Sequence, residues 1–261
     1  MKTAVITLSR EGGILAAKLL DSMPGAEGFI HEKVEGADGR LKKFSRVIDL
    51  TLEIFSRFGG LVYIAPCGAI VRAIAPNISG KKADPAVVQM DVGGRYAVSL
   101  LSGHEGGAND LAMRVANIIG AEPVISTTTE AAKNLIVGVG CRKGKNAESI
   151  IKAVKAALAE ASAPIEMVRL LASADVKAEE PGLLEAAAAL GLPIRFISSE
   201  EIRRPEFCFE RSAFVEKSVN LPAVAEPAAL LAGRRTSLIL KKKKYDGVTV
   251  AIAKENSLSL G

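Results

Sequence analysis

Short apolar runs alternate with amphipathic stretches along the first half of the chain. Each run is rich in Val, Ile and Leu and has the length of a buried strand, whereas the amphipathic stretches have helical periodicity. The expected strands span residues 3–8, 29–34, 61–65, 86–90, 96–101 and 123–126. The expected helices span residues 14–20, 41–58 and 109–119. This order of elements is typical of a sheet covered by helices.

The alternation stops at residues 127–134 and then restarts in the second half. Strands are expected at residues 135–139, 167–172 and 194–197, and helices at residues 147–160 and 179–190. Two final apolar runs, residues 237–240 and 247–253, predict a closing β hairpin with a turn at residues 245–247. We therefore expect an α/β protein of two domains, residues 1–131 and 135–261, each with a mostly parallel sheet.

The charge balance favours an acidic partner. Lys and Arg number 34 against 29 Asp and Glu, which gives a net charge of +5 over 261 residues. The run of four lysines at residues 241–244 is expected to be a solvated turn between two strands. Basic residues are not interleaved with aromatic ones, and no segment resembles a recognition helix. A polyanionic small molecule is thus a better candidate than nucleic acid.

Cysteine and histidine usage argues against a disulfide framework or a structural metal. The three cysteines, Cys67, Cys141 and Cys208, are far apart, and the only histidines are His31 and His104. Cys67 follows an expected buried strand, so we expect a buried structural thiol there. The N-terminus lacks a secretory pattern, and no apolar stretch reaches the roughly 20 residues that span a bilayer. We expect a cytoplasmic protein without a membrane partner.

The most informative segment lies within residues 99–126, where a strand leads into Gly103-His104-Glu105-Gly106-Gly107 and then a helix. Glycines allow close backbone approach, and a helix N-terminus offers N–H donors and a partial positive charge. The pattern predicts a carboxylate or phosphate site in which His104 donates or accepts a proton. A simple glycine-rich turn has the same pattern, and the sequence leaves both interpretations open.

Several long segments match one known family. In the first half these are CGAIVRAIAPNISGKKADPAVVQMD, residues 67–91, and RYAVSLLSGHEGGANDLA, residues 95–112. In the second half they are GVGCRKG, residues 138–144, LASADVKAEEPGLLE, residues 171–185, and DGVTVAIA, residues 246–253. These segments resemble the cobalt-precorrin-5A hydrolases of anaerobic cobalamin biosynthesis. The resemblance implies hydrolytic opening of the δ-lactone of cobalt-precorrin-5A, with release of acetaldehyde and formation of cobalt-precorrin-5B.

The implied substrate is an anionic cobalt tetrapyrrole, which carries its own cobalt, so no cofactor or protein-bound metal is expected. Its many carboxylates require cationic donors. The expected binding residues are Arg72, Lys81, Lys82, Ser102, Gly103, Gly106, Gly107, Asn109, Arg142 and Gly144. We expect acid–base catalysis by His104, oriented by Asp91 or Glu105. Ser102 is either a nucleophile or a hydroxyl that caps backbone groups.

Two departures from the family pattern bear on function. Val92 stands where the family usually has Glu, and residues 126 and 135 lie close together where family members carry a middle domain. A non-catalytic protein that binds a corrinoid intermediate and assists other enzymes of the pathway is therefore a second hypothesis. A nucleotide-binding enzyme is a third, but neither glycine loop has Gly-x-Gly-x-x-Gly or Walker spacing. The oligomeric state stays open.

Overall fold

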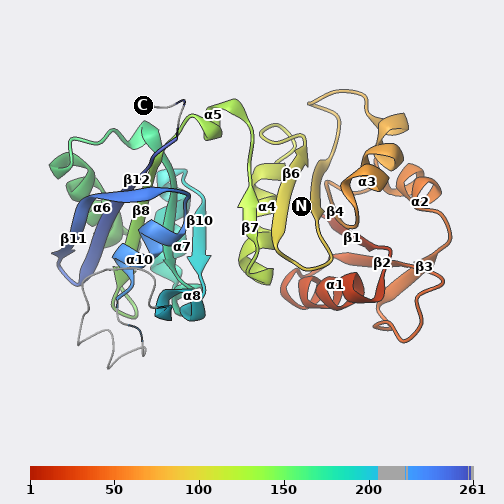
Figure 1. Ribbon diagram of the computed structural model, residues 1–261, viewed down its shortest axis with the longest axis horizontal. Helices are drawn as coiled ribbons and strands as arrows, with labels where there is room; N and C mark the ends of the chain where they lie inside the picture. The colour runs from red at the N-terminus through yellow and green to blue at the C-terminus, as the bar shows by residue number, and fades with distance from the viewer. Residues whose placement is uncertain (205–220, 222, 258, 260–261) are drawn as a thin grey trace. The chain divides into compact units, whose positions relative to one another are not determined.

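The computed structural model describes residues 1–204, 221, 223–257 and 259 (Figure 1). The chain divides into two compact units, Met1–Thr127 and Thr128–Gly261, and each unit is an α/β structure with its own sheet. The expected fold class is therefore confirmed. Cys208 lies outside the described residues. In the described part of the chain, no helix is long and apolar enough to cross a bilayer.

In unit 1, helices cover both faces of a seven-stranded sheet. The strand order is β3-β2-β1-β4-β5-β6-β7, and all neighbouring strands are parallel except β5 and β6. The strands are β1 (Thr3–Thr7), β2 (Glu27–His31), β3 (Leu41–Phe44), β4 (Gly60–Ile64), β5 (Ala86–Met90), β6 (Tyr96–Leu101) and β7 (Glu122–Val124). The helices are α1 (Arg10–Ser22), α2 (Val47–Ile54), α3 (Cys67–Ile74) and α4 (Ala108–Ile119).

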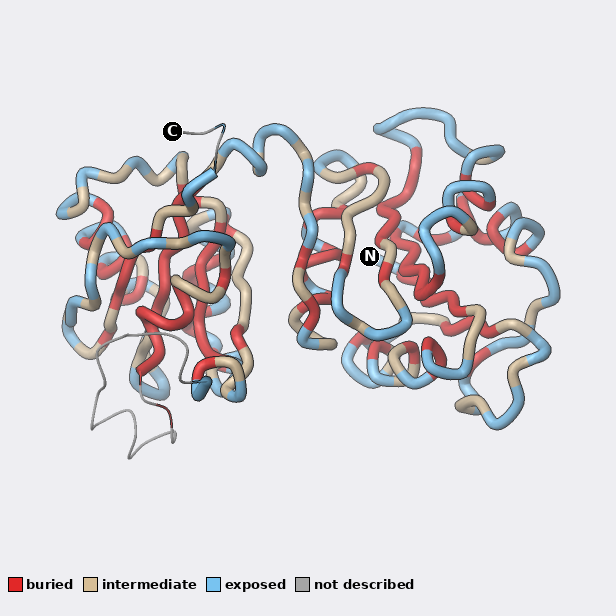
Figure 2. Tube along the Cα trace, viewed as in Figure 1, coloured by how far each residue is buried: buried red, intermediate tan, exposed pale blue. Residues whose placement is uncertain are grey.

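The two faces of this sheet follow from the alternation of side chains along each strand. On β1, Val5 packs with the apolar residues of α1 and α4, whereas Ala4 and Ile6 pack with those of α2 and α3. β1 and β4 are buried along their whole length, as their continuous apolar runs predict (Figure 2). The result is a three-layer structure with a core on each side of the sheet.

Unit 2 contains a five-stranded sheet in the order β10-β9-β8-β12-β11. Its strands are β8 (Leu135–Cys141), β9 (Val168–Ala174), β10 (Ile194–Ile197), β11 (Thr236–Tyr245) and β12 (Val248–Glu255). The first three are parallel, and β11 and β12 form the expected antiparallel closing hairpin. The helices are α5 (Thr128–Ala131), α6 (Ala147–Glu160), α7 (Pro181–Leu190), α8 (Ser199–Arg203) and α10 (Ala225–Leu231). Residues of α6 and α7 share a core with β8, β9 and β12.

Two glycines of β8 allow α10 to pack directly on the sheet. A Cβ on Gly138 would lie 1.9 Å from the Ala225 carbonyl oxygen, and one on Gly140 would lie 3.3 Å from the Val224 Cβ. The backbone of α10 therefore occupies the space that a side chain at Gly138 would need. These glycines belong to the packing of α10, whereas the turn that follows them begins at Arg142.

The structure corrects two expectations about elements. Residues 41–58 do not form one helix: Leu41–Phe44 is strand β3, and the helix is only Val47–Ile54. Leu41 is held in the sheet because it packs over Gly28, its partner residue on β2. The lysines at residues 241–244 form part of β11 instead of a turn, since β11 continues to Tyr245 before the chain reverses.

Candidate functional site

The loop that carries His104, residues 102–107, joins β6 to α4 at the amino end of β5. Because β6 runs antiparallel to β5, its carboxyl end meets the segment that leads into β5. There the Lys81 Nζ lies 3.0 Å from the Glu105 Oε1, and a Cβ on Gly106 would lie 3.1 Å from the Asp84 carbonyl oxygen. His104 is exposed in the same loop. The structure thus brings predicted site residues from two segments together, and we call residues 102–107 the His104 loop.

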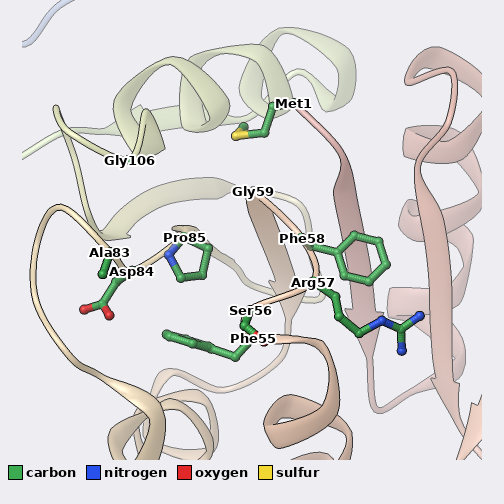
Figure 3. Close-up of a pocket in the computed structure, with 10 residues that line it drawn as sticks. All are labelled: Met1, Phe55, Ser56, Arg57, Phe58, Gly59, Ala83, Asp84, Pro85 and Gly106. Atoms are coloured by element: carbon green, nitrogen blue, oxygen red, sulfur yellow. The ribbon is translucent and has the colours of Figure 1, made fainter.

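A pocket of about 430 Å³ adjoins the His104 loop (Figure 3). Gly106 contributes to its wall beside Ala83, Asp84 and Pro85, and the remainder comes from Met1 and the turn between α2 and β4. Its lining residues are Met1, Phe55, Ser56, Arg57, Phe58, Gly59, Ala83, Asp84, Pro85 and Gly106. The Arg57 guanidinium extends away from Asp84 and Pro85 and pairs with Glu53. The volume lies within the range of about 300–1,000 Å³ that small-molecule sites occupy.

Several backbone amides between the His104 loop and the start of α4 donate to carbonyl oxygens of the loop itself. The N–H groups of Gly106 and Ala108 donate to the Ser102 carbonyl oxygen at 3.2 and 3.1 Å. The Asn109 N–H donates to the Gly103 carbonyl oxygen at 3.0 Å. These donors were expected to hold an anion at the start of α4, and they already have carbonyl partners. The geometry favours the glycine-rich turn, so an anion at this loop would be held by side chains.

Two polar side chains expected to face a substrate are buried instead. Ser102 is 8% exposed, and its Oγ has no hydrogen-bond partner among the described residues. Neither a backbone-capping hydroxyl nor an accessible nucleophile fits this position. Asn109 is also 8% exposed: its Nδ2 donates to the Thr127 Oγ1 at 3.1 Å, and its Oδ1 accepts from the Ser99 Oγ at 2.8 Å. Its side chain is therefore engaged inside the protein.

Asp91 does not orient His104, which corrects that expectation. Asp91 follows Met90 at the carboxyl end of β5, whereas the His104 loop follows Leu101 at the other end of the β5–β6 pair. The four residue-to-residue steps from Ala97 to Leu101 put about 13 Å of strand between Asp91 and the loop. Glu105, the other predicted orienting carboxylate, lies next to His104 in the loop and pairs with Lys81.

The other predicted cationic residues of unit 1 are exposed. Lys82 follows Lys81 in the segment before β5, and Arg72 lies on α3. The Arg72 Nη1 donates to the Gly68 carbonyl oxygen at 3.0 Å, one turn earlier on the same helix. Cys67 is exposed at the first position of α3, so the expected buried thiol is wrong. The reason is that a helix begins immediately after Pro66 and turns this residue outward.

In unit 2, the predicted basic glycine loop, residues 142–145, follows β8. Residues of the α7 start and of the closing hairpin turn bond to it. The Gly144 N–H donates to the Glu180 Oε1 at 2.6 Å, and the Arg142 N–H donates to the Gly247 carbonyl oxygen at 3.2 Å. The Lys145 Nζ pairs with the Asp246 Oδ2 at 2.8 Å. The Gly144 amide is therefore occupied by a protein carboxylate. Arg142 is exposed in this loop.

The thiol of Cys141 lies at the end of β8 beside a buried ion pair. The Lys177 Nζ lies 3.3 Å from the Glu180 Oε2, and both side chains are nearly inaccessible. Burial raises the pKa of the Cys141 thiol, and Glu180 adds to the rise while Lys177 opposes it. Cys141 is thus a protonated, half-buried thiol at neutral pH. Among the described residues, no three His, Cys, Asp or Glu side chains are grouped to hold a metal ion.

The predicted site residues divide between the units, with Arg142 and Gly144 in unit 2 and the others in unit 1. Sequence reasoning missed Thr127 and Ser99, which bond to Asn109, and Glu180, which holds Gly144. Thr127 and Ser99 gave no signal because their role depends on contacts between distant segments. Glu180 precedes Pro181-Gly182, a pattern that predicts a helix start but no contact with another loop.

Comparisons with known proteins agree over both units. Residues 135–253 match the family described as Cobalamin synthesis G C-terminus, and residues 49–130 match Cobalamin synthesis G N-terminal. A cobalt-precorrin-5A hydrolase of Priestia megaterium is 26% identical, and the alignment covers 96% of this chain and 94% of that protein. The cobalt-precorrin-5A hydrolase of Salmonella typhimurium is 23% identical, with 92% and 94% covered. Protein CobE of a Sinorhizobium species is 35% identical over 48% of this chain and 83% of its own length.

The alignment with the Priestia megaterium protein shows that this chain is shorter than its relative. Because 96% of this 261-residue chain is about 251 residues, about 100 of the 352 aligned positions have no counterpart here. This agrees with the expected lack of a domain that relatives carry. The two family matches nevertheless adjoin within a few residues and together cover most of the chain. The chain belongs to the cobalt-precorrin-5A hydrolase family and has a role in cobalamin biosynthesis.

Proposed function

We propose that the chain hydrolyses cobalt-precorrin-5A to cobalt-precorrin-5B. Water opens the δ-lactone of the macrocycle, and the bridging carbon leaves with its methyl group as acetaldehyde. The observation that carries the proposal is the alignment with two proteins named cobalt-precorrin-5A hydrolase, each covered over 94% of its length. The alignments run along nearly the whole of both relatives, and this chain supplies a counterpart for most of the aligned positions.

The His104 loop supports this proposal by its chemistry. An exposed imidazole can donate or accept a proton, and both lactone opening and cleavage of a carbon–carbon bond require proton transfer. Lys81 and Lys82 place two ammonium groups in the adjacent segment, where they suit the carboxylates of a tetrapyrrole. The hydrogen bond from Lys81 lowers the pKa of Glu105, so Glu105 is ionised at neutral pH. We assign Glu105 to holding the loop and His104 to proton transfer.

The direct test is anaerobic incubation of the full chain with cobalt-precorrin-5A and measurement of released acetaldehyde. We expect turnover by the wild type and a fall in kcat of about 10²-fold or more in His104→Gln, with KM changed less than threefold. His31→Gln is the matched control, because His31 is the only other histidine. Equal losses in both variants would contradict a catalytic role for His104.

A second function is favoured by the roughly 100 aligned positions that have no counterpart here and by Val92 in place of the family's usual Glu. The chain would then bind a corrinoid intermediate and pass it to neighbouring enzymes without turnover. Tight binding of cobalt-precorrin-5A with no acetaldehyde over many protein equivalents would support this function and reject the hydrolase. Acetaldehyde release that scales with protein concentration would reject the binding protein.

A further inference from the structure

The segment that joins the two units is attached to the His104 loop. Thr127 is the last residue of unit 1, and its Oγ1 accepts a hydrogen bond of 3.1 Å from the Asn109 Nδ2. Asn109 lies in the first turn of α4, directly after the loop. Its Oδ1 accepts the Ser99 hydroxyl at 2.8 Å, so one buried amide ties β6, α4 and the joining segment together.

Thr127 also packs on the residue that precedes His104. A Cβ on Gly103 would lie 2.5 Å from the Thr127 Cγ2 and 3.0 Å from the Asn109 Oδ1. The Gly103 carbonyl oxygen accepts the Asn109 N–H at 3.0 Å, and the His104 carbonyl oxygen accepts the Gly107 N–H at 3.2 Å. The backbone on both sides of the imidazole is therefore fixed, and Thr127 supplies one of the contacts.

The loop is kept in a conformation that it would not adopt alone. Ser102 has a φ of 57°, in the left-handed region that non-glycine residues rarely occupy. Its hydroxyl is buried without a hydrogen-bond partner among the described residues. Both features cost free energy, and such a conformation persists where neighbouring groups hold it. The neighbours that hold the Gly103 side of this loop are Asn109 and Thr127.

We propose that Thr127 and Asn109 are positioning residues for His104, so that the segment leading to unit 2 controls where the imidazole lies. This inference rests on the proposed function, in which His104 transfers a proton. A shift of Thr127 displaces Gly103 by direct contact and leaves the Asn109 amide without its acceptor. His104 follows Gly103 immediately, and a misplaced catalytic group loses rate with little loss of substrate binding.

The test uses isosteric variants of Thr127 in the full chain. Thr127→Val removes the acceptor oxygen and keeps the methyl group that packs on Gly103, whereas Thr127→Ser keeps the oxygen and removes that methyl group. We expect Thr127→Val to lower kcat by about tenfold or more with KM changed less than twofold, and Thr127→Ser to stay within threefold of wild type. Thr128→Val, at the exposed next position, is the matched control and should change neither constant.

A second measurement does not depend on turnover. The chain has only two histidines, so its imidazole C–H signals in NMR are assigned by their loss in His104→Gln and His31→Gln. We expect Thr127→Val to shift or broaden the His104 signals and leave those of His31 in place, with no change in Thr128→Val. Unchanged His104 signals in Thr127→Val would overturn the inference, whatever the activity.

The two proposals fail in different ways. If the wild type releases no acetaldehyde but Thr127→Val still moves the His104 signals, the hydrolase is rejected and the positioning role stands. If the wild type turns over and Thr127→Val matches it in kcat and in its His104 signals, the positioning role is rejected. Should Thr127→Val not fold, Ser99→Ala removes the other bond to the Asn109 amide and is expected to move the same signals.

Discussion

Asp91 ends β5 and organises the turn that leads to β6. Its Oδ1 accepts the N–H groups of Arg95 and Tyr96 at 2.9 and 3.0 Å, and its Oδ2 accepts the Gly93 N–H and the Arg95 Nε at 3.2 and 3.0 Å. Burial opposes ionisation, but the bonds from Arg95 and Tyr96 outweigh it and hold the pKa of Asp91 below its ordinary value. These bonds describe a turn-capping carboxylate in the resting fold.

We therefore expect Asp91→Ala to lower the free energy of unfolding by about 1–2 kcal/mol at pH 7, as the loss of a helix cap does, with kcat within twofold of wild type. Because the folded pKa is depressed, the stabilisation is complete above about pH 4 and is lost as pH falls through the folded value. Urea unfolding at pH 7 and pH 3 should thus show a smaller difference at the lower pH. A large fall in kcat at unchanged stability would instead make Asp91 catalytic.

The sequence identified segments that the structure brings together, but not the contacts that each side chain makes. Lys81 and Glu105 were both expected at the site, and they pair across two loops. Asn109 follows a glycine loop and therefore looked like a ligand-binding residue, but its partners are 10 and 18 residues away. Cys67 was expected to be buried because it follows a buried strand, but it is the first residue of helix α3 and is exposed. The direction of a side chain depends on tertiary contacts that no local pattern records.

At the level of elements, the strand β3 shows where periodicity is ambiguous. Residues 41–58 fit one amphipathic helix, yet Leu41–Phe44 pairs with β2 and only Val47–Ile54 is helical. β3 is a short edge strand with exposed Lys42 and Lys43, so it lacks the continuous apolar run that identified the buried strands. Its pairing depends on β2 and cannot be read from its own residues.

An ion-pair network supports this edge. Glu27 on β2 pairs with Lys2 at 2.8 Å and with Lys42 on β3 at 2.6 Å. The hydrogen bonds from these lysines lower the pKa of Glu27 to about 2. We expect Glu27→Gln to reduce the free energy of unfolding by about 1 kcal/mol at pH 7. The stabilisation is complete above about pH 4.3 and declines as pH falls towards 2, so the two proteins should converge in acid.

The control for this comparison is Glu53→Gln, which removes one exposed helix pair with Arg57 and should change stability by less than about 0.5 kcal/mol. Chemical unfolding across pH 2–7 measures both variants. A difference between wild type and Glu27→Gln that stays constant down to pH 2 would show that the charge of Glu27 contributes nothing to the edge.

The packing of α10 on β8 gives a sharper prediction. A Cβ on Gly138 would lie 1.9 Å from the Ala225 carbonyl oxygen, and backbone cannot move aside as a flexible side chain can. We expect Gly138→Ala to lower the free energy of unfolding by at least about 2 kcal/mol. Gly39→Ala is the control, because a Cβ there meets nothing within 4 Å, and its effect should stay within about 0.5 kcal/mol. Equal unfolding midpoints for Gly138→Ala and Gly39→Ala would contradict the close packing of α10 on β8.

For the whole molecule, strand–helix alternation was enough to predict two α/β units, because most parallel pairs are joined by a crossover helix. The last buried residue in the two apolar cores of unit 1 is Ala121, and the first buried residue in the core of unit 2 is Leu135. No cluster in the described chain takes residues from both units. The relative Protein CobE is matched over 83% of its length by about half of this chain. A half-length piece of this family thus exists as a protein in its own right.

We therefore expect the pieces 1–127 and 128–261 to fold separately, each with a cooperative thermal transition and dispersed amide signals in NMR. The predicted site is divided, with His104 in the first piece and Arg142 and Gly144 in the second. Each piece is therefore also incubated separately with cobalt-precorrin-5A, and released acetaldehyde is measured. Full activity of residues 1–127 alone would remove Arg142 and Gly144 from the site and confine the chemistry to the His104 loop.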